Sequence, residues 1–93
     1  MAYSVVWSPR ALDDVDSIAD YIARDSPAYA SAVVGKILDA TRSLSGFPLS
    51  GRVVPEFGDE TLREKIVYSY RVIYRVEAEI VIIASVVHGK QIL

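Results

Sequence analysis

Arginines are the side chains of this chain best suited to holding a charged partner. Arg71, Ile73 and Arg75 alternate along a segment with strand character, so all three project from one face of a sheet. Arg52 lies on a predicted loop, and Arg63 with Lys65 on the preceding predicted strand. We expect the five cations to converge into a patch for phosphate or carboxylate groups. The alternative is surface ion pairing with nearby carboxylates, namely Glu56, Glu60, Glu64 and Glu77.

His88 is the single histidine, and it ends the last predicted strand beside Gly89. It is either a proton-transfer group or a strand-end residue bonded to a loop carbonyl. One histidine without any cysteine supplies no recognisable zinc or iron set, so no metal site is predicted. The glycines are scattered and form no phosphate-cradling loop, so no cofactor is expected. Two sets of side chains are assigned ordinary roles: strand packing for Tyr68, Tyr70 and Tyr74, and a solvated helix face for Asp13, Asp14, Asp16 and Asp20.

The composition of the whole chain indicates one compact domain spanning residues 1–93. Hydrophobic residues make up 52% of the 93 positions and charged residues 24%, which is typical of a globular protein. The absence of cysteine and of any long apolar run predicts a cytoplasmic protein with no membrane contact. A net charge of -2 argues against a strong nonspecific grip on nucleic acid.

The elements that position these residues follow an α+β order. Tyr3 to Trp7 predicts a strand, and Ser8 with Pro9 predicts the start of an amphipathic helix of about four turns. Ser26 with Pro27 starts a second helix, which ends before Ser45 and forms a hairpin with the first. Residues 47–58 predict an ordered loop. Three strands then form an antiparallel meander, at Leu62 to Tyr68, Arg71 to Val76 and Ile80 to Val87.

The last predicted strand, IVIIASVV, is apolar at both alternating sets of positions. That pattern is typical of a strand buried on both faces, whereas two helices can cover only one face of this sheet. We therefore expect the loop or another chain to cover the second face.

Several segments in this order resemble the toxins of the RelE/ParE superfamily of bacterial type II toxin–antitoxin, or plasmid-stabilisation, systems. The resemblance is carried by SPRALDDVDSIADYI, by FPLSGRVVPEF with its G-R-x-x-P-E loop, by the strand YRVIYR and by the ending VVHGK. It runs from about Trp7 to Lys90, and it implies the strand, helical hairpin and antiparallel sheet described above. It also implies a hetero-oligomer with an antitoxin, of ParD-like or RelB-like type.

The superfamily contains proteins that poison DNA gyrase and ribosome-dependent nucleases that cut messenger RNA, which share a fold without sharing a site. The acidic charge and the ending Gln91, Ile92, Leu93, without a terminal tyrosine, favour the gyrase branch, which is not enzymatic in itself. A nuclease, with Arg71 and His88 as catalytic residues, is the alternative. A degenerate toxin that only binds antitoxin is a third possibility. The resemblance implies target binding by Arg52, Arg63, Lys65, Arg71, Arg75 and Lys90, and antitoxin binding by Val15, Ile18, Ile80 and Ile82.

Overall fold

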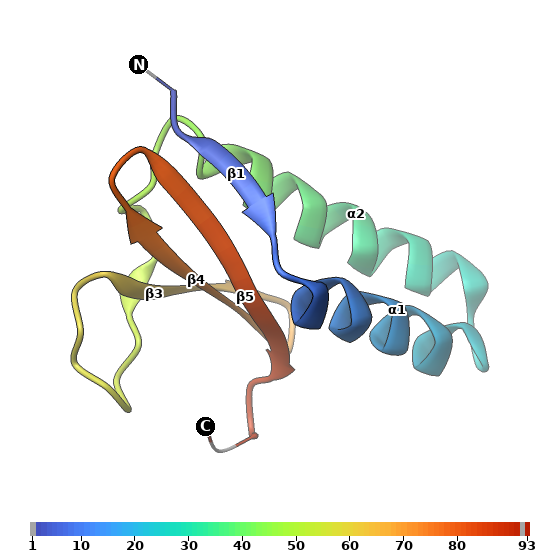
Figure 1. The fold of residues 1–93 in the computed structure, drawn as a ribbon. Coiled ribbons are helices and arrows are strands. Elements are labelled where there is room, and N and C mark those ends of the chain that lie inside the picture. The colour runs from blue at the N-terminus through green and yellow to red at the C-terminus, as the bar shows by residue number, and fades with distance from the viewer. Residues whose placement is uncertain (1, 92) are drawn as a thin grey trace.

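The computed structural model describes residues 2–91 and 93, and it confirms the α+β class (Figure 1). Two helices lie together on one side of a five-stranded sheet whose strand order is β1-β5-β4-β3-β2. The elements, in chain order, are β1 (Ser4–Trp7), α1 (Pro9–Ala23), α2 (Pro27–Ser43), β2 (Arg52–Val53), β3 (Leu62–Val67), β4 (Tyr70–Glu77) and β5 (Ile80–His88). Within the described residues, neither helix has the length and apolar composition required to span a bilayer.

Both helices begin where their capping residues predict. The Ser8 hydroxyl accepts the backbone N–H of Ala11, and the Ser26 hydroxyl accepts that of Tyr29, with a proline at the first helical position in each case. Each serine thereby satisfies one of the N–H groups that a helix start leaves without an internal partner. The Ser8 hydroxyl also donates to the carbonyl of Ala84 at 2.9 Å, which ties the start of α1 to β5.

The meander of β3, β4 and β5 is confirmed, but the sheet is larger than predicted. β1 pairs in parallel with β5, placing Ser4 opposite Ile80 and Trp7 opposite Ile83. β2 forms within the segment predicted as loop and pairs antiparallel with β3. The turn between β3 and β4 lies at Tyr68, which has a φ of 53°, so β4 begins one residue earlier than expected.

A register shift explains why β5 is apolar at both alternating sets. Ile73 of β4 lies opposite Ser85, whereas Tyr74 lies opposite Ile83, so Ala84 is an extra residue in β5. Such a bulge exchanges the two faces of a strand. Val81 and Ile83 therefore face the helices before the bulge, and Val86 faces them after it, in the main core.

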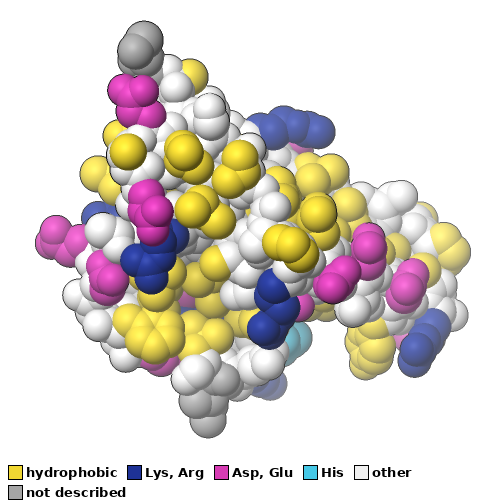
Figure 2. Space-filling model, viewed as in Figure 1, with side chains coloured by type: hydrophobic (Ala, Val, Ile, Leu, Met, Phe, Trp, Pro, Cys, Tyr) yellow, Lys and Arg dark blue, Asp and Glu magenta, His cyan; other side chains and the backbone are white. Residues whose placement is uncertain are grey.

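The open face, defined as the side of the sheet away from the helices, is only half covered. Val54 of the loop after β2 is fully buried there and packs with Ile73 and Val87. At the other end of the face, Val6 and Ile80 remain 45% and 43% exposed. Hydrophobic side chains gather over β1 and β5 in Figure 2. The loop thus covers one half of the face, as expected, and the second half is available to another chain.

Candidate functional site

Arg71 lies at the centre of a carboxylate network on the open face. Its two Nη atoms donate to the two carboxylate oxygens of Glu56 at 2.7 and 2.8 Å. Its Nε donates to Oε1 of Glu64 at 2.7 Å, and Nη2 lies 2.6 Å from the same oxygen. All three guanidinium nitrogens therefore have carboxylate partners. The Arg71 side chain is only 7% exposed, so little of it is left for an outside anion.

Glu64 is the buried half of this network, with a side chain that is 0% exposed. Its second oxygen, Oε2, accepts a hydrogen bond from Nε of Arg52 at 2.5 Å, so Glu64 contacts a second guanidinium. The hydrogen bonds from Arg71 lower the pKa of Glu56 to about 2, so Glu56 is ionised at neutral pH. The same two carboxylates raise the pKa of Arg71 further. The network is a charge-balanced unit of two arginines and two glutamates that ties the loop to the sheet.

Arg75 completes the arginines of the open face, and it too is paired. Its guanidinium lies 3.7 Å from Asp59 and 3.8 Å from Glu77, and Nη1 donates to Thr61 Oγ1 at 3.0 Å. The three arginines of this face thus contact four carboxylates, those of Glu56, Asp59, Glu64 and Glu77. The ion-pairing alternative describes this face better than a free basic patch does.

Arg63 and Lys65 do not join this group, and the predicted convergence is wrong for both. Arg63 pairs with Tyr74 and Lys65 with Val72, which belong to the helix side of β4. Directly opposite residues share a face, so these two cations lie across the sheet from Arg71. Arg63 Nη1 donates to the carbonyl of Gly51 at 3.0 Å, and Nε donates to that of Glu60 at 2.9 Å. Arg63 is therefore a loop-fastening residue.

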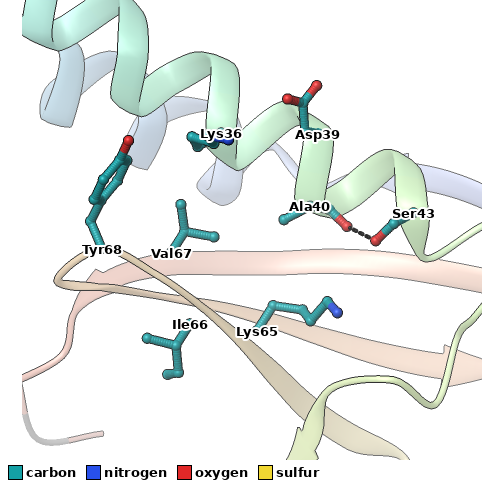
Figure 3. Close-up of a pocket in the computed structure, with 8 residues that line it drawn as sticks. All are labelled: Lys36, Asp39, Ala40, Ser43, Lys65, Ile66, Val67 and Tyr68. Carbon is teal, nitrogen blue, oxygen red and sulfur yellow. Dashed lines mark hydrogen bonds between the residues drawn. The ribbon is translucent and has the colours of Figure 1, made fainter.

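Lys65 lines a cleft of about 520 Å³ between α2 and β3 (Figure 3). Lys36 and Asp39 border it from the helix, and Tyr68 borders it from the turn after β3. The cleft is bordered by two lysines and one carboxylate, so it carries a local positive charge. It lies apart from the open-face arginines, and sequence reasoning did not distinguish the two places.

His88 lies on the helix side of the sheet, at the end of β5. It pairs with Tyr70, whereas Arg71 pairs with the preceding residue, Val87. Neighbouring positions on a strand point to opposite faces, so the two residues named for a nuclease are separated by the sheet. Nδ1 of His88 accepts the backbone N–H of Lys90 at 3.2 Å, so the neutral ring carries its proton on Nε2. Lys90 itself is exposed beyond the strand end.

The tyrosine hollow is the surface depression around His88, lined by Tyr21, Tyr29, Tyr70, His88, Asp14 and Asp25. The rings of Tyr70 and His88 meet edge to face, with centroids 5.7 Å apart. Burial, with smaller contributions from Tyr29 and Tyr21, raises the pKa of Tyr70, which keeps its phenol protonated. The tyrosine hollow was not predicted. Its side chains come from α1, α2 and the sheet, and these segments meet only in the folded protein.

Asp14 was expected on a solvated helix face, but it has a structural role. Its Oδ2 accepts the backbone N–H of Val86 at 2.9 Å, and its Oδ1 pairs with Arg10 at 3.1 Å. β1 ends at Trp7 opposite Ile83, so the rest of the β5 edge has no strand beside it. Asp14 thus caps an edge of the sheet from α1. Ile18 and Val15, predicted for antitoxin binding, pack against the core and are partly buried.

Among residues 2–91 and 93, no group of three or more histidine, cysteine or acidic side chains is placed to hold a metal ion.

The comparison with known families agrees with this fold. A family model described as the ParE toxin of the type II toxin–antitoxin system parDE matches residues 5–93. This chain belongs to the ParE toxin family. The resemblance to RelE/ParE superfamily toxins is thus confirmed, and the protein is a toxin of the type II toxin–antitoxin class.

The ParE-family chain is similar to two proteins that are named as toxins. It is 35% identical over 89 residues to Toxin RelE2 of Caulobacter vibrioides, covering 95% of this chain and 97% of that protein. It is 44% identical over 46 residues to the putative toxin Y4kP of Sinorhizobium fredii, covering 50% and 48% of the two chains.

Two solved structures share the fold of the ParE-family chain at low identity. A chain of the chromosomal ParDE system from P. aeruginosa aligns with a TM-score of 0.78 and 21% identity, covering 96% of this chain and 98% of that one. A chain of the RelBE2 toxin–antitoxin complex from Mycobacterium tuberculosis aligns with a TM-score of 0.64 and 23% identity, covering 95% and 92%. At these identities the likeness concerns the fold alone.

Proposed function

We propose that this ParE-family toxin acts on DNA gyrase, without cutting RNA, and is held inactive by an antitoxin of ParD-like type. The observation that carries the proposal is that every guanidinium nitrogen of Arg71 already donates to a carboxylate oxygen of Glu56 or Glu64. A nuclease arginine must present free N–H groups to a phosphate, and its field must attract a polyanion. Arg71 would have to exchange two carboxylates for one phosphate, on a face where carboxylates outnumber arginines.

The position of His88 supports the same proposal. General acid–base catalysis requires the proton donor and the charge-stabilising group to reach the same reacting atoms. His88 and Arg71 project from opposite faces of the sheet, so one bound phosphodiester cannot contact both.

A ribosome-dependent endoribonuclease is the second candidate, favoured by the contact between His88 and Tyr70. An imidazole beside a protonated phenol is a pair able to transfer protons, and one relative of the chain is named RelE2. In this case the reaction would use the helix side of the sheet, where Lys65 is the strand cation to be tested.

The experiment that separates the candidates measures both activities with the same purified toxin. We expect it to stabilise gyrase-cleaved DNA and to leave ribosome-bound messenger RNA intact. His88→Ala should retain the gyrase effect, as should the control Gln91→Ala at the same exposed end. Cleavage of messenger RNA that falls by about a hundredfold or more in His88→Ala would replace this proposal with the nuclease.

We propose the exposed half of the open face as part of the antitoxin interface, at Ile80, Ile82 and the adjacent Val6. These side chains lie together because Val6 pairs with Ile82 across the β1–β5 ladder. A bound antitoxin should raise the melting temperature of the toxin, with a stabilisation of about 4 kcal/mol at a thousandfold excess over Kd.

The matched variants for the antitoxin interface are Ile80→Asp and Ile66→Asp. Both remove an exposed isoleucine, 43% and 57% exposed respectively, but Ile66 lies on β3, away from β1 and β5. We expect only Ile80→Asp to reduce the stabilisation by antitoxin. Equal stabilisation of wild type and Ile80→Asp would remove this part of the face from the interface.

A further inference from the structure

The tyrosine hollow is a surface depression that has no role in the proposed action on gyrase. Two adjoining hollows of about 380 Å³ each share Tyr21, Tyr70 and His88. One continues to Asp14, and the other continues to Tyr29 and Asp25. The lining comes from α1, the turn after it, the start of α2 and the β4–β5 end of the sheet. Four separate segments therefore hold the walls in place.

Two aromatic side chains of the hollow, Tyr21 and Tyr29, contribute little to the core, whereas Tyr70 packs against it. Tyr21 is 68% exposed and Tyr29 is 51% exposed, so folding leaves most of their surface in water. Tyrosine and arginine are enriched at protein interfaces, where a rigid ring supplies contact area at low entropic cost. Tyr29 is also held by the ring of Tyr68, with centroids 6.1 Å apart.

The acidic side chains of the hollow favour a positively charged ligand. No lysine or arginine lines either part of it among the described residues, whereas Asp14 and Asp25 both do. Asp14 already bonds to Val86 and Arg10, but Asp25 is exposed and lines the hollow beside Tyr29. The faces of aromatic rings attract cations, and the effect adds to that of a carboxylate.

We propose that the tyrosine hollow receives an arginine side chain from a basic peptide segment of a partner protein. The planar guanidinium stacks on a tyrosine ring and reaches the Asp25 carboxylate, which a compact ammonium does less well. The Lys90 contact engages Nδ1 of His88, so Nε2 of this lining residue would donate to a backbone carbonyl of the peptide.

A stacked nucleobase is the other ligand that tyrosine rings accept, and the charges disfavour it. Each base carries a phosphate with it, and the hollow offers Asp14 and Asp25 where a nucleotide site needs cations. The two ligands are separated by direct titration.

The test uses the isotope-labelled full chain and three probes: the peptide acetyl-Ala-Ala-Arg-Ala-Ala-amide, the same peptide with glutamine in place of arginine, and adenosine monophosphate. Ring and imidazole resonances of Tyr21, Tyr29, Tyr70 and His88 are followed by NMR. We expect saturable shifts with the arginine peptide, and much weaker binding of the other two probes. Stronger binding of adenosine monophosphate would make the hollow a nucleotide site, and equal binding of the glutamine peptide would show that charge plays no part. Either result overturns the proposal, as does an absence of shifts with the arginine peptide.

Matched variants assign the effect to the hollow. Tyr21→Ala should weaken the arginine peptide about two- to fivefold, and Tyr21→Phe should not, because the ring face remains. Phe47→Ala removes an aromatic ring that is 71% exposed but lies outside the hollow, and it should leave binding unchanged. Asp25→Asn should reduce both affinity and its dependence on salt, whereas Asp16→Asn on the exposed face of α1 should not. Equal effects of Tyr21→Ala and Phe47→Ala would refute the assignment.

Discussion

Replacing Arg71 by alanine should destabilise the folded protein. We expect this loss of stability to be the main effect of the substitution, ahead of any lost contact with a target. The substitution leaves the Glu64 carboxylate, which is 0% exposed, with Arg52 as its one remaining ion-pair partner, and it releases Glu56 and its loop. Removing one partner of a buried ion pair costs about 3–5 kcal/mol, and the remaining contact of Glu64 with Arg52 places the expected loss near the lower end of that range. That is a large part of the free energy of unfolding of a small domain, about 5–15 kcal/mol.

Urea unfolding followed by the fluorescence of Trp7, the single tryptophan, measures this loss. With a urea dependence of about 1–2 kcal/mol per molar, a loss of about 3 kcal/mol lowers the midpoint by about 1.5–3 M. The double variant Arg71→Met with Glu64→Met removes both buried charges and keeps two long apolar chains. It should recover most of the stability, because replacing a buried pair by apolar groups is often nearly neutral.

Arg71 does not have this structural role if Arg71→Ala unfolds at the wild-type urea concentration but has lost its toxicity. Arg71 would then be a target contact, and its carboxylate partners would be incidental. A destabilised Arg71→Ala, with the double variant stable and still toxic, establishes the opposite.

Two further predictions concern the loop beside this network. The pKa of Glu56 is lowered to about 2, so the stability that the Glu56 carboxylate contributes is fully present above the ordinary value of 4.5 and is lost as pH falls toward 2. In Glu56→Gln, the unfolding midpoint should therefore change less between pH 4.5 and pH 2. Gly51→Ala should lower the melting temperature, at a cost of about 1–3 kcal/mol, because its Cβ would lie 2.5 Å from the carbonyl oxygen of Glu64 and 2.6 Å from the hydroxyl of Tyr74. Gly35→Ala in α2 meets nothing within 4 Å and should instead stabilise by about 0.5–1 kcal/mol, so equal shifts for the two glycine variants would contradict this packing argument.

Local signals in the sequence were enough to predict the helices and the meander. Serine followed by proline marks both helix starts, because a cap and a first-turn proline act within one turn of the chain. The side-chain alternation of β4 was predicted correctly too, with Arg71 and Arg75 sharing a face. These features depend on residues close together in sequence.

Features that depend on pairing between distant segments were not predicted. The parallel addition of β1 to β5 and the bulge at Ala84 are decided by the register of strands, which no local pattern specifies. The same limit affected the site. Arg63 was assigned to the wrong face because the alternation of β3 could not be aligned with that of β4, and the glutamate partners of Arg71 could be named only as one alternative.

The parallel pairing of β1 with β5 also affects how the chain folds during its synthesis. Ser4 and Ile80 are 76 positions apart, so β1 has no strand partner until almost the whole described chain has been made. Closing a loop of this length before any contact is gained slows folding, and β5 is synthesised after the other described strands. Val6 and the core-facing Trp7 therefore have no strand partner while the sheet of the nascent chain is incomplete. During that interval the strands expose unpaired backbone edges, with which other chains can form a β-ladder.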